Sequence, residues 1–241
     1  MSQLFFKKMG CVKLHILDEQ YKRTELKVSY INKELTFSNS TLNSRRWILI
    51  RFIDPDGKEP RLYVETTGFG HAFVTTGTGN NTTVYTYGRY GELGKDKSFA
   101  RSTTPTGEGV LIRLTGDEAK SFIQDQITNK GAVAFEFTKG SDEAVMKHFD
   151  DKFNSSDKSP TTGKYAGNEN AKVVDTYNVL TNNCVTVSVE GVQSGSKENL
   201  KLGDLKGPMA VRDVLNVQSG KQESNVIKIT PEEIKKELDL P

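Results

Sequence analysis

A cysteine and a histidine are the residues of this chain whose types could do chemistry together. Cys184 follows Asn182-Asn183, a pair typical of turns and helix caps, so its thiol can stand at a helix N-terminus. There the helix dipole lowers the pKa of a thiol and favours the nucleophilic thiolate. His71 opens a strand directly after Gly68-Phe69-Gly70, where glycine lets a ligand approach the backbone closely. A thiol nucleophile with an imidazole base is an arrangement suited to covalent catalysis.

The secondary structure that begins at Cys184 is open from the sequence alone. Val185, Val187 and Val189 alternate with polar residues, which is typical of a strand. Val185, Val189 and Val192 also form one stripe of a helix. Only the helical alternative places the thiol at a helix N-terminus.

No other residues indicate a metal or cofactor site. His15, His148 and Cys11 stand in contexts that favour structural or incidental roles. A transition-metal site needs clustered ligands, and no third His or Cys stands beside Cys184 or His71. The phosphate-loop, dinucleotide and HExxH motifs are also missing from the sequence. We therefore predict no metal and no cofactor.

The strands that must position the histidine are marked by alternating β-branched and aromatic residues. They are predicted at 61–65, 71–76, 82–87, 110–114 and 132–137. The second and third flank a loop rich in Gly and Asn, which tolerate left-handed dihedral angles, so we expect them to form a hairpin.

The register of this hairpin predicts a partner for the imidazole. If the loop is residues 77–81, Thr76 pairs with Thr82, and His71 then lies opposite Tyr87. Directly opposed residues share a face of the sheet, so Tyr87 is predicted to orient the imidazole. A slip of two residues would bring Tyr85 there instead.

The helices are indicated by their start signals. Thr115 and Glu118 form a capping box before an apolar stripe. Further helices are expected from Ser141, from Pro208 and from Thr230-Pro231. Segment 154–170 is rich in Ser, Lys, Thr, Gly and Asn and predicts a long mobile loop. We expect an α+β fold, with an antiparallel sheet packed against a few helices.

The chain divides into a leader, residues 1–60, and a denser domain, residues 61–241. The leader holds short apolar pieces at 13–17, 26–31 and 47–53, separated by polar linkers. The strong turn Asp54-Pro55-Asp56-Gly57 places the boundary, because Pro fixes φ and Gly supplies a positive φ.

Composition excludes several classes of protein. There are 33 basic and 31 acidic residues, a net charge of +2, so no nucleic-acid partner is expected. The richest apolar stretch is broken by Arg51 and is too short for a membrane span. Two cysteines exclude a disulfide-stapled miniprotein. The first residues do not form a signal peptide, so we expect synthesis in the cytoplasm, with any export through a signal-independent secretion system.

Two segments carry a resemblance to a known superfamily. Gly-Phe-Gly-His-Ala-Phe-Val at 68–74 and Asn-Asn-Cys-Val-Thr at 182–186 resemble the circularly permuted branch of the NlpC-type, papain-like cysteine hydrolases. In that branch the histidine strand precedes the cysteine helix, an order shared by lecithin retinol acyltransferase-like proteins. The resemblance covers residues 65 to 217 and implies a permuted papain-like fold.

The resemblance also implies roles and a function. Cys184 would be the nucleophile and His71 the general base. The orienting group, Tyr87, comes from the hairpin register and departs from the superfamily, whose members often have His, Asn or an acid there; Asn183 is an oxyanion donor or simply a cap. The activity implied is that of a thiol-dependent amidase or peptidase. Peptidoglycan stem peptides would be its substrate. The protein would act as a toxin-like bacterial effector, with an immunity protein as its partner. A thiol acyltransferase and a non-catalytic binding or interaction module on the same fold are the alternatives.

The leader has a resemblance of its own. Met9-Gly10-Cys11-Val12-Lys13-Leu14, the region of Trp47 and the turn 54–57 are similar to the junction that closes the core of Rhs repeat-associated proteins. In those proteins a variable toxin-like domain follows the junction. The Rhs repeats themselves do not occur in this sequence, so neither delivery nor autoprocessing follows from the resemblance.

Overall fold

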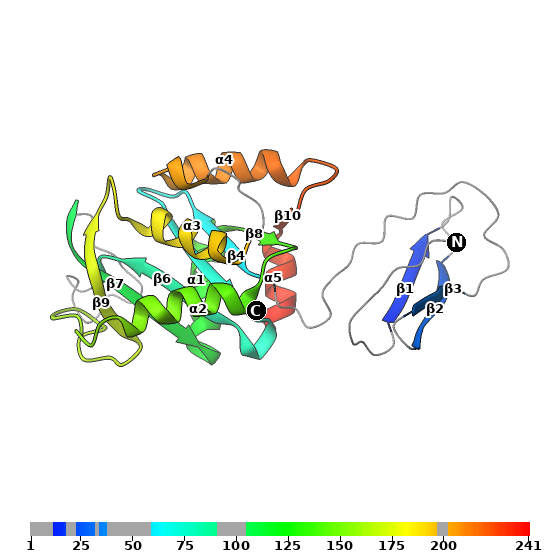
Figure 1. The fold of residues 1–241 in the computed structure, drawn as a ribbon, viewed down its shortest axis with the longest axis horizontal. Helices are drawn as coiled ribbons and strands as arrows, with labels where there is room; N and C mark the ends of the chain where they lie inside the picture. The colour runs from blue at the N-terminus through cyan, green and yellow to red at the C-terminus, as the bar shows by residue number, and fades with distance from the viewer. Residues whose placement is uncertain (1–11, 18–22, 32–33, 38–58, 91–104, 197–201) are drawn as a thin grey trace. The chain divides into compact units, whose positions relative to one another are not determined.

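The computed structural model describes residues 12–17, 23–31, 34–37, 59–90, 105–196 and 202–241. The chain divides into two compact units, Met1–Pro55 and Asp56–Pro241. In the first, β1 (Val12–Leu17), β2 (Arg23–Ile31) and β3 (Glu34–Phe37) form an antiparallel sheet (Figure 1). The apolar pieces 13–17 and 26–31 lie in β1 and β2. Cys11, Trp47 and the boundary turn 54–57 lie outside the described residues.

The second unit is built on a seven-stranded antiparallel sheet with the order β10-β8-β4-β5-β6-β7-β9. Its strands are β4 (Arg61–Glu65), β5 (His71–Thr76), β6 (Thr83–Gly88), β7 (Thr106–Thr115), β8 (Val133–Phe137), β9 (Ala171–Asn178) and β10 (Val226–Ile229). The helices are α1 (Gly116–Asn129), α2 (Asp142–Asn154), α3 (Cys184–Gly195), α4 (Pro208–Ser219) and α5 (Pro231–Leu238), with short 3-10 turns η1 (Gly79–Asn81) and η3 (Leu202–Asp204). The predicted α+β class with an antiparallel sheet is confirmed.

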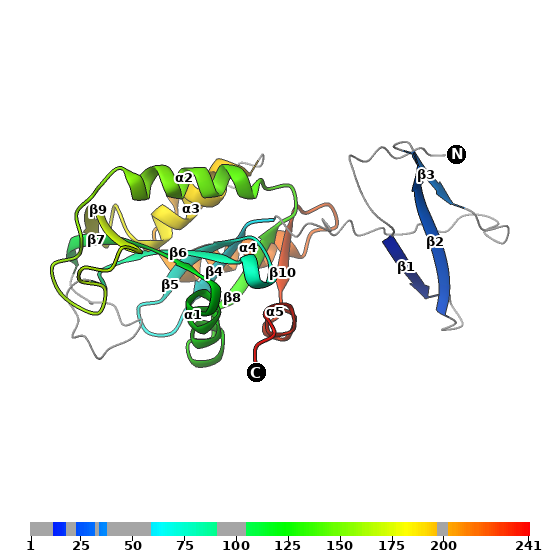
Figure 2. The ribbon, with the colours of Figure 1, turned by 90° about the horizontal axis from the view of Figure 1, so that it is seen from below.

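Helices cover both faces of this sheet (Figure 2). On the face that we call the α3 face, helices α2, α3 and α4 bury residues such as Phe149, Val187 and Leu215 against the strands. On the opposite face, the α1 face, helices α1 and α5 bury residues such as Phe122 and Ile234. Each strand therefore contributes alternate side chains to two separate apolar cores.

The helix start signals are borne out to different degrees. Ser141 caps α2, because its Oγ accepts a hydrogen bond from the Ala144 N–H at 3.2 Å. Thr230 and the residue three positions on form the capping box of α5. Helix α1 begins directly after Thr115, but the predicted capping box is not formed. Thr115 is still paired with Thr83 in the sheet, which holds it in the strand.

Segment 154–170, predicted as a long mobile loop, has no helix or strand after α2 ends at Asn154, and hydrogen bonds tie it to the edge strand β9. The Ser156 hydroxyl donates to the Val173 carbonyl at 2.7 Å, and the Val173 N–H donates to the Lys158 carbonyl at 2.7 Å. Tyr165 of the same segment is buried and meets the Tyr90 ring edge-on. The segment thus occupies backbone groups on the outer edge of β9.

Helices α2 and α3 pack closely because a glycine of α3 faces an aromatic ring of α2. A Cβ built on Gly191 would overlap the Phe149 ring. We expect Gly191→Ala to lower the free energy of unfolding by about 1–3 kcal/mol, the usual cost of overpacking a core. An exposed helix position would instead gain up to about 1 kcal/mol from the same change.

Urea unfolding followed by circular dichroism measures this difference. Gly203→Ala is the control, because the nearest atom to its added Cβ is a side-chain oxygen at 3.9 Å. Equal stability of the two variants would show that α2 and α3 do not depend on this close approach.

Candidate functional site

The sheet separates the two predicted catalytic residues. Cys184 is the first residue of α3 and belongs to the core of the α3 face. Along β5, Ala72 and Val74 belong to that core, whereas Phe73 belongs to the core of the α1 face. Side chains alternate along a strand, so His71 shares the face of Phe73, and their ring centroids are 6.2 Å apart. The predicted pairing is corrected: His71 and Cys184 face opposite sides of the sheet.

His71 instead joins a buried polar cluster on the α1 face. Its Nε2 lies 2.7 Å from Thr86 Oγ1 and 3.3 Å from the Tyr90 hydroxyl. The Thr86 and Tyr90 hydroxyls are themselves 2.7 Å apart. Glu65, also buried, stands directly opposite His71 in β4. His71 is 0% exposed, so this cluster is part of the interior rather than of an open site.

The hairpin register differs from the prediction by one residue. Thr76 pairs with Thr83 rather than with Thr82. The reason lies in the connection, because Gly79–Asn81 forms a 3-10 turn and Thr82 closes it with a hydrogen bond from its N–H to the Gly79 carbonyl. The turn therefore takes up one more residue than a simple loop would.

A shift of one residue moves every side chain of a strand to the other face of the sheet. Tyr85 and Tyr87 accordingly lie in the core of the α3 face, together with Cys184. The predicted role of Tyr87 in orienting His71 is therefore wrong. The alternative register, shifted by two residues, would have placed Tyr85 opposite His71, and it does not occur either.

Asn183 is a structural cap of α3. Its Oδ1 accepts hydrogen bonds from the N–H groups of Val185 and Thr186 at 2.8 and 3.1 Å. Its Nδ2 donates to the carbonyls of Val179 and Lys206 at 2.7 and 3.1 Å. The whole amide is engaged in holding the turn, so Asn183 is a cap and not an oxyanion donor. The same capping box resolves the open secondary structure in favour of a helix.

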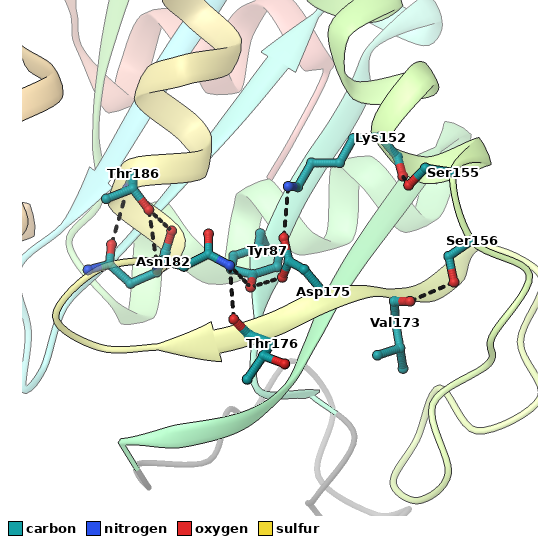
Figure 3. A network of polar contacts seen from close by, with 10 residues as sticks. Tyr87, Lys152, Ser155, Ser156, Val173, Asp175, Thr176, Asn182 and Thr186 are labelled. Atoms are coloured by element: carbon teal, nitrogen blue, oxygen red, sulfur yellow. Dashed lines mark hydrogen bonds and ion pairs between the residues drawn. The ribbon is translucent and has the colours of Figure 1, made fainter.

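A second polar cluster lies on the α3 face, close to the start of α3 (Figure 3). The Tyr87 hydroxyl of β6 donates a hydrogen bond to Asp175 Oδ1 of β9. The other carboxylate oxygen of Asp175 lies 2.8 Å from Lys152 Nζ of α2. Asn182, in the turn before α3, donates from Nδ2 to the Tyr87 oxygen at 3.1 Å. Three elements and the turn that precedes α3 therefore meet in this cluster.

Electrostatics connects this cluster to the cysteine. Burial raises the pKa of Tyr87 well above its ordinary value, and the bond to Asp175 raises it further. Negative charge on Cys184 adds to the upward shift of the Tyr87 pKa. The phenol therefore stays protonated at neutral pH, and the thiol lies within electrostatic reach of it.

Glycine at position 109 makes the arrangement sterically possible. A Cβ built on Gly109 would overlap both the Tyr87 hydroxyl and Asp175 Oδ1. The pairing of β7 with β9 shifts between Gly109 and Val110, a β-bulge that re-aims the side chains of the neighbouring strand. The bulge and the missing side chain together bring the Asp175 carboxylate to the phenol.

Solvent reaches the rim of the cluster more than its centre. The side chains of Asp175 and Lys152 are 27% and 25% exposed, whereas Cys184 is 8% exposed. Asp175, Lys152 and the role of Asn182 were not foreseen from the sequence, which marked Asn182 only as a turn residue. Asp175 could have been found in the sequence as an acidic residue in a strand shortly before the helix that begins at Cys184.

The described part of the chain holds no group of three or more His, Cys, Asp or Glu side chains that could bind a metal ion. Among the helices that it contains, none is long and apolar enough to cross a membrane. Comparison with protein-family models, with curated proteins and with solved structures gives no match to this chain. The function is therefore inferred from the site.

The capping role of Asn183 predicts a loss of stability on substitution. Asn183→Ala removes both the cap and the bonds to the Val179 and Lys206 carbonyls, and we expect the free energy of unfolding to fall by about 2 kcal/mol. Asn183→Asp keeps the acceptor oxygen and should recover part of the loss. Thermal unfolding of the two variants measures this order, and unchanged stability of Asn183→Ala would contradict the capping role.

Proposed function

We propose that this domain is a thiol-dependent amidase or peptidase with Cys184 as its nucleophile. The observation that carries the proposal is the position of Cys184 at the capped N-terminus of α3, next to the cluster of Tyr87, Asp175 and Lys152. A helix N-terminus stabilises a thiolate, and neighbouring protic side chains can exchange protons with it.

The reaction proceeds through a covalent intermediate. The Cys184 sulfur attacks the amide carbonyl carbon, and collapse of the tetrahedral intermediate breaks the carbon–nitrogen bond. The amine leaves with a proton, and the acyl group remains on sulfur as a thioester. Water then hydrolyses the thioester and restores the thiol. His71 takes no part, because it faces the α1 side of the sheet.

We propose peptidoglycan stem peptides as the substrate. The protein would then be a toxin-like bacterial effector that has an immunity protein as its partner and is exported by a signal-independent secretion system. The proposal rests on the resemblance of segments 68–74 and 182–186 to permuted papain-like hydrolases. A cysteine at a helix N-terminus, packed on an antiparallel sheet, agrees with that resemblance, whereas the place of His71 departs from it. Transfer of the thioester to an acceptor other than water would give the acyltransferase variant.

A binding or interaction module is the second candidate. The observation that favours it is the separation of Cys184 from His71 by the sheet, which leaves the fold without the cysteine–histidine pair of the family it resembles. In this case the domain binds a peptide without cleaving it.

The first experiment incubates the full chain with purified stem peptides and detects new amino termini by mass spectrometry. We expect Cys184→Ala to abolish cleavage while the circular dichroism spectrum stays unchanged, because the substitution removes a single buried sulfur atom and leaves the Asn183 cap of α3 in place. Cys11→Ser is the matched control and should cleave as the unaltered chain does.

Cleavage by Cys184→Ala at the normal rate would exclude the thiol mechanism. Absence of cleavage in every variant, with retained binding of the stem peptides in a pull-down on purified sacculi, would favour the binding module.

A further inference from the structure

We propose that this domain docks on the surface of an anionic lipid bilayer through three segments that meet at the start of α3. The segments are residues 66–70, 178–183 and 205–209, and together we call them the docking surface. The inference goes beyond the proposed function and does not depend on it, because docking needs no reaction of the thiol.

Specific contacts hold the three segments side by side. The amide Nδ2 of Asn183 donates to the Val179 carbonyl at 2.7 Å and to the Lys206 carbonyl at 3.1 Å, so it joins the second segment to the third. A Cβ built on Gly70 would lie 2.8 Å from Pro208 Cγ, so the first segment packs against the third where α4 begins. The segments therefore form one surface, directly before the first residue of α3.

Large apolar side chains of the docking surface are exposed to solvent. Phe69 is 84% exposed, Leu180 73%, Met209 59% and Val179 43%. These are four of the six large apolar residues that are exposed in the described part of the chain. Exposed apolar side chains gathered on one surface mark a site of association with an apolar partner.

The backbone of the docking surface is suited to an apolar environment. All six N–H groups of residues 178–183 donate hydrogen bonds within the protein. In the first segment the Gly70 N–H donates to the Thr67 carbonyl at 3.1 Å, and in the third Pro208 carries no N–H. Unpaired backbone donors are costly to remove from water, so their pairing lowers the cost of placing these segments in the bilayer interface. An extended peptide would find no N–H donor for its carbonyls along residues 178–183.

The charges on and around the docking surface fit an anionic headgroup layer. Lys206, which is exposed, is the one charged residue among its sixteen, although 27% of the residues in the whole chain are charged. Lys130 borders the first segment, where its carbonyl accepts a hydrogen bond, and Asp204 borders the third. The neighbouring Arg212 and Asp213 neutralise each other at 2.9 Å. An apolar centre with a small excess of cations is typical of proteins that lie in a bilayer interface, where anionic headgroups attract the cations.

The shape of the docking surface distinguishes a bilayer from a protein partner. Phe69 and Leu180 lie in separate turns, and neither belongs to a helix or a strand face. A protein partner needs a complementary pocket for each such side chain, whereas the fluid bilayer interface surrounds isolated side chains at any spacing. Docking would hold the start of α3, and with it Cys184, close to the bilayer.

Flotation of the full chain with lipid vesicles tests the inference. The vesicles contain equal parts of phosphatidylglycerol and phosphatidylcholine, and we expect the chain to float with them. Phe69→Ser and Leu180→Ser should each lower the partition coefficient by about 10-fold, because each removes an apolar side chain that the bilayer would bury.

Met146→Ser is the matched control and should float as the unaltered chain does. It removes an exposed apolar side chain from α2. Helix α2 begins at the opposite end of α3 from the docking surface, where the Ser141 N–H donates to the Gly195 carbonyl at 2.9 Å.

A fluorescent side chain measures insertion directly and answers the question if a serine variant fails to fold. Trp47 is the single tryptophan of the sequence, so Phe69→Trp in the Trp47→Phe background reports on position 69 alone. On addition of the same vesicles we expect its emission to shift to shorter wavelength and to be quenched by brominated acyl chains.

Three results would overturn the inference. The first is that the unaltered chain does not float with the vesicles. The second is that Phe69→Ser and Leu180→Ser float as the unaltered chain does, which would assign vesicle binding to another part of the chain. The third is a dimer in sedimentation velocity that Phe69→Ser dissociates, without vesicle binding, which would assign the docking surface to a second copy of the chain. Cys184→Ala should float normally, so docking and stem-peptide cleavage can fail separately.

Discussion

The alternation of side chains along β5 and β6 is the constraint on which the arrangement of this domain depends. Both strands are covered on both faces, so each residue contributes to one of two cores that the backbone keeps apart. Hydrogen bonding of the ladder fixes the register, and burial on both sides prevents it from slipping. His71 and Tyr87 are thereby assigned to different cores, although a simple loop between the strands would have set them opposite each other.

Much of the fold could be predicted from local signals. Alternating β-branched and aromatic residues located β4, β5 and β8 closely, and Ser141 and the proline at 231 marked helix starts. The register could not be predicted, because Gly79–Asn81 does not reveal in its sequence that it adopts a 3-10 turn. Strand β9 was also missed. Its bulge opposite Gly109 breaks the period of two on which strand prediction relies.

In the candidate site, too, local features could be predicted from the sequence and long-range contacts could not. Cys184 and its capping asparagine were recognisable, because a helix start is encoded within a few residues. The polar side chains that meet near the start of α3 come from β6, β9 and α2, and their meeting depends on long-range strand pairing and on Lys152 reaching across from a helix. A resemblance based on short segments correctly placed Cys184 at a helix N-terminus. The same resemblance gave His71 as the partner of Cys184, but His71 lies on the opposite face of the sheet.

The outer edge of β9 has a consequence for how molecules can associate with this domain. An exposed edge strand offers backbone groups to any extended chain, and proteins avoid unwanted sheet extension by covering such edges. Here Ser156 and Lys158 are hydrogen-bonded to the backbone groups of Val173, and Asn182 donates a hydrogen bond to the Thr176 carbonyl. Strand addition is thus blocked at the edge nearest to Cys184. A peptide that reaches the thiol must be recognised through side-chain and turn contacts, and neighbouring copies of the domain cannot polymerise through this edge.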